Sequence, residues 1–302
     1  MATQHLIVFG LGYTGAAVAR AAAAAGLAVT ATSRDPATAP RIAGVAVVDF
    51  ARVAPALARA THVLATAPPP GDGGDAQDGV DPVLHAHGAK IAAARHLRWA
   101  GYLSTTGVYG DRAGGWVDEA TPPAPSQDRS RRRLAAEQAW TALADHLAID
   151  IFRVAGIYGP GRSALDDLRA GRARRVIRPG HAFGRIHRDD IACAVLAALR
   201  QDRPPGARVL NLNDDEPAEP SVVVEEAARL LGLDPPPAVA FADAEARMSP
   251  MARSFWQESR RVSSAATQAA LGLRWRYPSY REGLAGILAE ERGAEQAGDG
   301  AA

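Results

Sequence analysis

Three glycines near the start of the chain have the spacing of a phosphate-binding turn. Gly10, Gly12 and Gly15 lie between a short apolar run and an alanine-rich run, in the order strand, turn, helix. In such a turn the first glycine permits a sharp bend, the second lets a diphosphate approach the backbone, and the third lets the helix pack closely. The helix N-terminus then offers unpaired N–H groups to the phosphates. The turn, including Tyr13 and Thr14, is therefore predicted to bind a dinucleotide.

The end of the second expected strand bears on which dinucleotide is bound. This strand ends at Ser33 and Arg34, and Asp35 follows. An acidic side chain here would accept a hydrogen bond from the ribose 2′-OH of NAD, whereas a serine hydroxyl and an arginine fork suit the 2′-phosphate of NADP. Asp35 is the competing candidate, but it is equally suited to capping a turn. The sequence therefore favours NADP, with NAD as the less favoured cofactor.

These residues need a scaffold, and strand and helix patterns alternate along the first half of the chain. The alternation predicts a parallel sheet with helices on both faces, the doubly wound Rossmann arrangement of an α/β fold. Ligands of such sheets lie at the carboxyl ends of the strands. The expected strands are 5–9, 27–32, 45–48, 62–66, 102–105 and 149–154, and the expected helices are 16–25, 82–99 and 130–146. The glycine- and aspartate-rich stretch 71–79 is expected to be a mobile surface loop.

Beyond the sixth strand the pattern loosens and proline and glycine recur, which indicates a smaller C-terminal substrate lobe. We expect the Rossmann domain to cover 1–155, with 188–213 returning to it. The smaller substrate-binding lobe would then comprise 156–187 and 214–292, and 293–302 would be a flexible tail. Further helices are expected at 189–201, 221–231, 263–271 and 280–291.

Composition places the chain among ordinary globular proteins. Of its 302 residues, 47% are hydrophobic and 22% are charged, which argues against disorder in the body of the chain. No stretch approaches the ~18 apolar residues of a membrane span, and the first ten residues do not resemble a secretory signal. A net charge of +1 gives no general attraction to nucleic acid. The single cysteine, Cys193, excludes an internal disulfide and a thiolate metal cage, so we expect a cytoplasmic protein without a metal.

Four segments together resemble the extended short-chain dehydrogenase/reductases, the NAD-dependent epimerase/dehydratase superfamily. They are 10–15, 103–110, 153–161 and 185–192, in the order and spacing of that family. The resemblance covers nearly the whole chain and implies an enzyme that acts on a carbonyl or hydroxyl group, often of a sugar nucleotide. The first glycine of the family's usual three-glycine motif would fall at Phe9, whereas the glycines here are Gly10, Gly12 and Gly15. This pattern resembles the atypical branch of the family.

The resemblance also implies cofactor contacts at further strand ends. Asp49 and Phe50 stand where the family contacts adenine, and Tyr158 is expected along the cofactor cleft. The segment after the fourth strand lies, in the family, against the cofactor's ribose and diphosphate. In this chain that segment is Ala65, Thr66, Ala67 and Pro68.

The departures from the family pattern concern its catalytic residues. Family members use a tyrosine and a lysine four residues apart: the tyrosine exchanges a proton with the substrate, and the lysine holds the nicotinamide ribose and lowers the tyrosine pKa. The only lysine here is Lys90, with Ala86 four residues before it, so the chain contains no Tyr-x-x-x-Lys. Alignment with the family places Arg129 at the tyrosine position and Arg133 at the lysine position. Arginine stays charged and cannot transfer the proton, although Arg133 could still hold the ribose.

The remaining catalytic candidates each have a plain structural alternative. Thr105 matches the family's Ser/Thr position and could contact substrate or cofactor, or could bond its own backbone. Tyr109 and Tyr158 follow strands and could supply the missing proton, or could pack a loop and bond a carbonyl. His187 could be an acid or base near neutral pH, or a packed histidine. Arg133 could belong only to the solvated face of a basic helix.

We therefore expect an NADP(H)-dependent oxidoreductase or epimerase-like enzyme of the atypical extended type, with a small-molecule substrate. Hydride would pass between the nicotinamide and a carbonyl or hydroxyl carbon, and the protein would supply position. Because the dyad is missing, a non-catalytic NADP(H)-binding redox sensor or regulator is the alternative. A nucleotide-independent isomerase on the same scaffold is a third hypothesis. Neither nucleic acid nor a membrane is an expected partner, and a homodimer is compatible with the resemblance, since family members often pair through helices.

Overall fold

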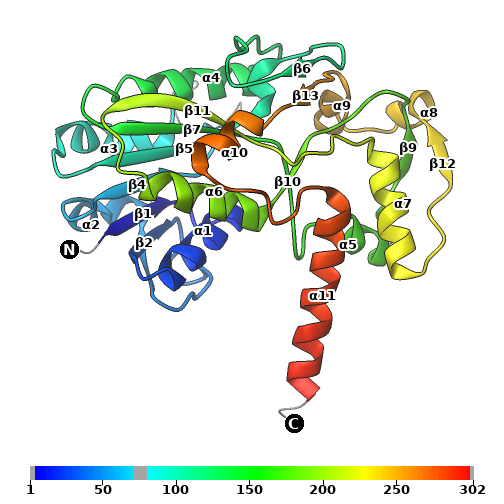
Figure 1. The fold of residues 1–302 in the computed structure, drawn as a ribbon, viewed down its shortest axis with the longest axis horizontal. Helices are drawn as coiled ribbons and strands as arrows, with labels where there is room; N and C mark the ends of the chain where they lie inside the picture. Colours follow the sequence, from blue (N-terminus) through cyan, green and yellow to red (C-terminus); the bar gives the residue numbers. More distant parts are fainter. Residues whose placement is uncertain (1–3, 71–79, 300–302) are drawn as a thin grey trace.

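A seven-stranded parallel sheet forms the centre of the computed structural model, which describes residues 4–70 and 80–299. The strands lie in the order β11-β7-β5-β4-β1-β2-β3 (Figure 1), and every neighbouring pair is parallel. This confirms the predicted doubly wound α/β fold. The strands are β1 His5–Phe9, β2 Ala28–Ser33, β3 Val45–Asp49, β4 His62–Ala65, β5 Trp99–Thr105, β7 Ala148–Val154 and β11 Gly206–Leu212.

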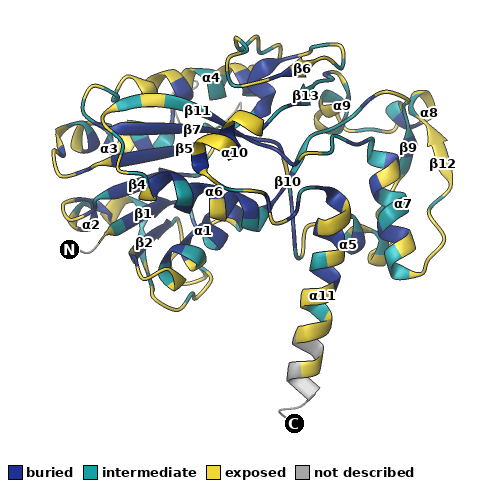
Figure 2. Ribbon diagram, viewed as in Figure 1, coloured by how far each residue is buried: buried dark blue, intermediate teal, exposed yellow. Residues whose placement is uncertain are grey.

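Helices cover both faces of the sheet, and alternate residues of β1 point into two separate cores. Leu6 and Val8 pack under α1 (Tyr13–Ala24) and α6 (Arg188–Arg200). Ile7 and Phe9 face the other core, which contains residues of α2 (Ala54–Leu57), α3 (Pro82–Ala93) and α4 (Asp128–Thr141). The central strands are therefore buried from both sides (Figure 2), as their continuous apolar sequence requires.

A second lobe is built from chain that leaves the sheet after β7 and again after β11. Its short strands pair as β8 (Gly156–Tyr158) with β10 (Arg185–His187), and β9 (Arg175–Ile177) with β12 (Ala238–Ala240). A further pair, β6 (Trp116–Val117) with β13 (Arg261–Val262), joins a loop that follows β5 to the later chain. The remaining helices are α5 Ala164–Arg169, α7 Pro220–Leu231, α8 Phe241–Glu245, α9 Pro250–Trp256, α10 Ala265–Leu271 and α11 Tyr280–Asp299.

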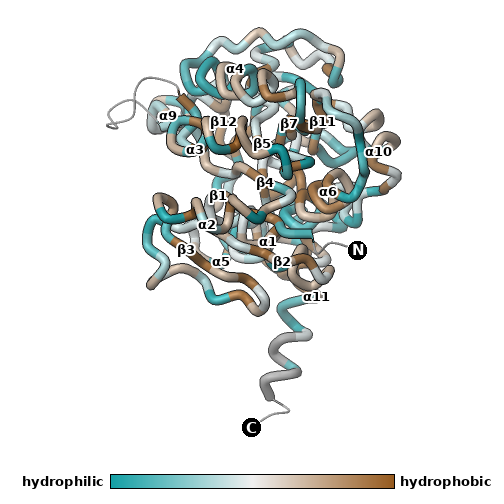
Figure 3. Tube along the Cα trace, turned by 90° about the vertical axis from the view of Figure 1, so that its left-hand side faces the viewer, coloured by the Kyte–Doolittle hydropathy of each residue, from teal (hydrophilic) through white to brown (hydrophobic). Residues whose placement is uncertain are grey.

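Several helix boundaries differ from the expected ones, and α4 ends at Thr141 instead of 146. The helix expected over 82–99 ends at Ala93, and Trp99 already belongs to β5, where it pairs with both β4 and β7. Ladder bonds to two neighbouring strands outweigh the local helix propensity of this segment. Helix α11 continues to Asp299, through part of the tail expected from 293, and projects from the second lobe (Figures 1 and 3). The flexibility of this tail stays a prediction. The loop expected over 71–79 lies outside the described residues.

No helix in the described ranges 4–70 and 80–299 is both long enough and apolar enough to cross a membrane.

Candidate cofactor site

The glycine-rich turn joins β1 to α1 at the carboxyl edge of the sheet. Gly10 has a φ of +105°, and a Cβ there would stand 2.7 Å from Thr66 Oγ1. A Cβ on Gly15 would lie 2.0 Å from the carbonyl oxygen of Gly10, so helix and turn meet too closely for a side chain. Around Gly12, in contrast, a Cβ would find no atom within 4 Å. The turn is closed on its inner side and open at Gly12, which fits the approach of a diphosphate.

The first turn of α1 is free to accept negative charge. Its N-cap is the exposed Gly12, no side chain caps it, and it contains no acidic residue. The first helical bond of α1 runs from the N–H of Ala16 to the carbonyl of Gly12, which leaves the N–H groups of the preceding turn for a ligand. The structure of this corner therefore suits the diphosphate of a dinucleotide.

Two threonine hydroxyls hold the corner in shape from the neighbouring strands. The N–H of Gly10 donates to Thr32 Oγ1 at 3.1 Å. The hydroxyl of Thr66 lies 3.0 Å from the carbonyl oxygen of Phe9 and 2.8 Å from that of Gly10. Thr66 was among the predicted site residues. Thr32 was not, although it directly precedes the predicted Ser33 in the sequence. Of the other residues predicted after β4, Ala65 is fully buried, Ala67 is half-buried and Pro68 is exposed.

The end of β2 separates the two candidates for the cofactor ribose. The carboxylate of Asp35 accepts hydrogen bonds from the N–H of Ala37 at 3.0 Å and the hydroxyl of Thr38 at 2.9 Å. These bonds hold the pKa of Asp35 below its usual value, the Thr38 bond contributing most. Ser33 bonds to the backbone of Asp35 within the same turn. Asp35 thus caps its own turn, while the side chain of Arg34 is exposed and makes no hydrogen bond or ion pair within the described chain.

The end of β3 places its two predicted residues in different roles. Asp49 accepts a hydrogen bond from the N–H of Ala51 at 2.8 Å and caps the 3₁₀ turn Phe50–Arg52. The ring of Phe50 packs against Phe9 and His87, with centroids 6.1 and 4.9 Å away. Contact with adenine at these residues stays a prediction.

At the other end of the predicted cleft, the structure brings Thr105 and Arg133 to the same strand. Thr105 is half-buried at the end of β5, and its Oγ1 accepts the N–H of Gly107 at 3.1 Å. Because that bond uses the oxygen as an acceptor, the hydroxyl proton remains available to another group. Arg133 reaches from α4 to donate to the carbonyl of Leu103, two residues before Thr105, and its guanidinium stacks 5.7 Å from the ring centre of Tyr102.

Arg129, which aligns with the family's tyrosine, contacts the second lobe. Its guanidinium lies 4.2 Å from the ring centre of Phe255 on α9. Next to it, the side chain of Gln127 donates to the carbonyl of Ser254 at 2.7 Å, and Ser126 bonds to Glu258. The start of α4 therefore fastens the second lobe to the sheet domain at this position.

The hydroxyls of both candidate tyrosines already have partners. Tyr109 is fully buried and donates to Asn211 Oδ1 at 2.8 Å. Tyr158 donates to the carbonyl of Ser279 at 3.3 Å in the second lobe. Burial raises the pKa of each hydroxyl. Either tyrosine would have to give up an existing bond before it could donate a proton to a substrate.

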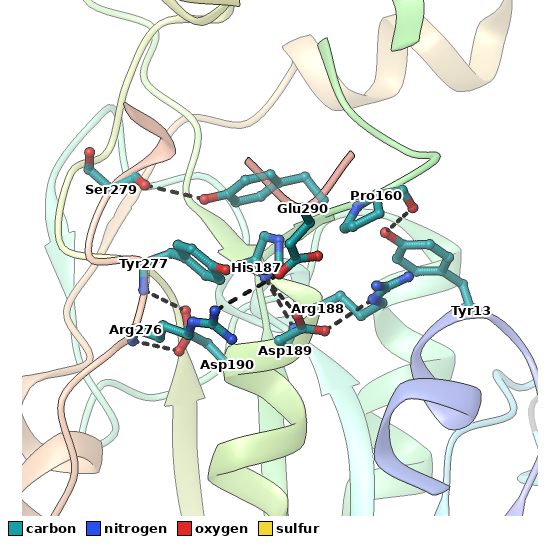
Figure 4. Close-up of polar contacts among 11 residues, drawn as sticks. Tyr13, Pro160, His187, Arg188, Asp189, Asp190, Arg276, Tyr277, Ser279 and Glu290 are labelled. Carbon is teal, nitrogen blue, oxygen red and sulfur yellow. Dashed lines mark hydrogen bonds and ion pairs between the residues drawn. The ribbon is translucent and has the colours of Figure 1, made fainter. Parts of the chain in front are cut away.

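His187 is fully buried at the junction of β10 and α6 (Figure 4). Its Nδ1 accepts the N–H of Asp189 at 3.2 Å, which makes it the N-cap of α6. Its ring packs against Tyr277 at 4.2 Å and Tyr158 at 5.2 Å, and burial lowers its pKa to about 4. His187 is therefore a neutral, packed histidine at pH 7. Neighbouring Asp190 accepts the N–H groups of Arg276 and Tyr277, tying the later chain to α6.

The parallel sheet and the open glycine-rich turn at its carboxyl edge define a Rossmann-type nucleotide-binding protein. Among the residues that the structure describes, no group of three or more His, Cys, Asp or Glu side chains could hold a metal. The family model of the NAD dependent epimerase/dehydratase family matches residues 6–212, and the chain belongs to that family.

Three similar proteins differ in how much of this chain they match and in how closely. The chain is 45% identical to a functionally unknown conserved protein from Silicibacter pomeroyi DSS, with a TM-score of 0.87 over 95% of this chain and 99% of the other. It is 36% identical to Protein YeeZ of Escherichia coli K12 over 140 residues, which are 45% of this chain and 47% of YeeZ. That match therefore spans about half of YeeZ. MoeE5, solved with UDP-glucuronic acid and NAD, shares the fold at 20% identity, with a TM-score of 0.75 over 96% of this chain and 99% of MoeE5.

Proposed function

We propose that the protein is an NADP(H)-dependent oxidoreductase or epimerase-like enzyme that works without a Tyr-x-x-x-Lys dyad on a carbonyl or hydroxyl substrate. The observation that carries this proposal is the open diphosphate corner at Gly12 together with the end of β2, where Asp35 is bound in its own turn and Arg34 is exposed. A guanidinium that faces solvent beside a ribose site favours a 2′-phosphate over a 2′-hydroxyl.

Each strand end along the carboxyl edge of the sheet binds a different part of the cofactor. The N–H groups from Gly12 to Gly15 bind the diphosphate, with Thr32 and Thr66 fixing the turn. Ser33 and Arg34 bind the 2′-phosphate. Asp49 and Phe50 border the adenine. The segment Ala65, Thr66, Ala67 and Pro68 lies along the ribose and diphosphate through its backbone.

The nicotinamide end uses two side chains of β5 and α4. When bound, the nicotinamide supplies or accepts a hydride at its C4 carbon. Arg133 keeps a positive charge beside the nicotinamide ribose, at the position where the family has a lysine. The hydroxyl of Thr105 donates a hydrogen bond to the substrate oxygen, since its own oxygen is oriented by Gly107. Because the hydroxyls of Tyr109 and Tyr158 are engaged, the exchanged proton comes from a substrate group or from water.

Sugar nucleotides are the first substrates to test, because members of the family often act on them and because MoeE5 was solved with UDP-glucuronic acid. The decisive experiment is calorimetric titration with NADPH, NADP, NADH and NAD, followed by turnover at 340 nm on nucleotide sugars and small ketones. We expect micromolar or tighter binding of NADPH. With one of these substrates we expect either net consumption of NADPH or, for an epimerase that regenerates its cofactor, an epimerised product seen by chromatography. If none of the four nucleotides gives heat of binding, the proposal is wrong.

The second candidate function is a redox sensor or regulator that binds NADP(H) without turnover. The specific observation in its favour is Arg129, a permanent cation at the position of the family's proton-donating tyrosine, held by Phe255 of the second lobe. Tight binding of NADPH, with neither a loss of absorbance at 340 nm nor an epimerised product across the substrate panel, would favour this candidate.

A further inference from the structure

Tyr13, inside the glycine-rich turn, touches a loop 147 positions further along the chain. Its hydroxyl donates to the carbonyl of Pro160 at 3.1 Å (Figure 4). Gly159 precedes that proline with a φ of +154°, and a Cβ there would stand 2.7 Å from the Tyr13 hydroxyl. The loop that starts at Gly159 therefore lies over the N-terminus of α1, in contact with the first residue of that helix.

Two arginines of the second part of the chain lie over the same tyrosine ring. The guanidinium carbon of Arg188, the first residue of α6, is 4.9 Å from the ring centre of Tyr13. That of Arg162, from the loop after Pro160, is 5.7 Å away. Both cations thus lie next to the residue that follows Gly12, where the first turn of α1 has neither an acidic residue nor a side-chain cap.

Both arginines beside the Tyr13 ring keep guanidinium N–H groups that no residue of the described chain accepts. Arg188 gives its Nε to Asp189 at 3.2 Å, and no bond within the described chain occupies its two terminal amino groups. The side chain of Arg162 is exposed and makes no hydrogen bond or ion pair there. Asp166 is the other nearby acid, and it accepts the hydroxyl of Ser163 at 2.6 Å. Two forks with free N–H groups therefore flank an open helix N-terminus.

We infer that Arg162 and Arg188 complete the diphosphate site, so that the dinucleotide is gripped from both parts of the molecule. This inference rests on the proposed function and deepens it. The backbone amides of α1 face one side of the diphosphate, and the two arginine forks, which match phosphate oxygens in geometry and charge, face the other. Tyr13 is a positioning residue: its ring holds both guanidiniums, and its hydroxyl holds the loop at Pro160.

The test replaces each arginine and measures the affinity for ligands that do or do not contain a diphosphate. Arg162→Gln and Arg188→Gln are each expected to raise the Kd of NADPH and of ADP-ribose about tenfold, because a charged hydrogen bond is lost. The Kd of 2′-AMP, which has no diphosphate, stays the same. Arg200→Gln is the matched control, since it removes an exposed charge at the opposite end of α6 and leaves all three constants unchanged.

The outcomes separate this inference from the proposed function. If the unmodified protein binds no dinucleotide, the proposed function fails first. If it binds, but both arginine variants retain its affinity for NADPH and ADP-ribose, only this inference is overturned. A loss that extends to 2′-AMP, or that affects NADPH but spares ADP-ribose, also overturns it, because the arginines would then act elsewhere.

Tyr13 is tested by a pair of variants. Tyr13→Phe keeps the ring beneath both guanidiniums and is expected to weaken NADPH binding by less than threefold. Tyr13→Ala removes the ring and is expected to weaken it as much as the two arginine changes combined, with the 2′-AMP affinity unchanged. Equal effects of the two variants, or an effect of either on 2′-AMP, would contradict the positioning role.

Discussion

At the scale of single residues, Arg129 and Arg133, which the sequence predicts at the positions of the family's catalytic pair, have different neighbours. Arg133 turns inward to the carbonyl of Leu103 at the end of β5. Arg129 turns outward to Phe255 in the second lobe. The sequence predicts the loss of a proton donor at this helix, and the structure adds that Arg133 is held against β5.

Arg34 decides the choice between the two dinucleotides in the proposed function. Arg34→Ala is expected to raise the Kd of NADPH about tenfold or more, because a charged hydrogen bond to the 2′-phosphate is lost. The Kd of NADH should change by less than twofold. Calorimetry on both ligands measures this, and equal losses for NADPH and NADH would remove the case for NADP.

Thr105 is expected to act on the reaction and not on cofactor affinity. Thr105→Val keeps the shape of the side chain but removes the hydroxyl, so the rate of hydride transfer should fall about 100-fold. Thr105→Ser should keep most of the rate, and the Kd of NADPH should be the same in both variants. Single-turnover loss of absorbance at 340 nm measures the rate, and full activity of the valine variant would exclude Thr105 from the chemistry.

At the scale of elements, local patterns predicted the glycine-rich turn, six of the seven strands of the sheet, and the helices α7, α10 and α11 of the second lobe. They missed β11 and the short helices α5, α8 and α9. They failed at Trp99, because pairing with β4 and β7 is a contact between distant segments that no local pattern records. The same reason hid the contact of Tyr13 with Pro160. Thr105 and Arg133 could be proposed from family motifs. The hydroxyls of Tyr109 and Tyr158, in contrast, bond to a side chain and to a backbone carbonyl more than 100 positions away.

The cap of α6 makes stability depend on pH. Burial lowers the pKa of His187 to about 4, while an unfolded histidine binds its proton near pH 6.5. Between these two values the unfolded chain binds more protons than the folded protein, so the free energy of unfolding falls as the pH drops from about 6.5 to 4. Between pH 7.5 and pH 4.5, urea unfolding should show a loss of stability to which His187 contributes about 2 kcal/mol. Buried His62, whose pKa burial also lowers to about 4, adds to the same loss.

Two histidine variants test whether His187 causes this loss of stability at low pH. His187→Gln removes the titration and should make the change in stability between the two pH values smaller. His85→Gln, at an exposed histidine of α3, should leave it as in the unmodified protein. Identical pH dependence in the two variants would mean that His187 is not responsible.

At the scale of the whole molecule, the sheet domain and the second lobe meet where the cofactor is proposed to lie. Tyr13 touches the loop after Gly159, and Arg129 touches α9. A dinucleotide bound at that junction would stabilise both parts together, since any ligand that binds only the folded state shifts the unfolding equilibrium.

A concentration of NADPH 100-fold above its Kd should therefore raise the free energy of unfolding by about 2.7 kcal/mol. Differential scanning calorimetry should show a single unfolding transition whose midpoint is several degrees higher. With its Kd raised about tenfold, Arg34→Ala should lose about half of this shift at the same NADPH concentration. Two transitions, of which only one moves with NADPH, would contradict a cofactor shared by the two parts.

The order of strands has a consequence for how the chain is made. Strand β11 pairs with β7 along its whole length, and α6 packs on α1, yet both are synthesised after the excursion over residues 156–187. On the ribosome, the first 155 residues would emerge with the outer side of β7 unpaired and the apolar side of α1 uncovered, a state prone to aggregation. Nascent chains of that length should therefore depend on chaperones until α6 and β11 have emerged.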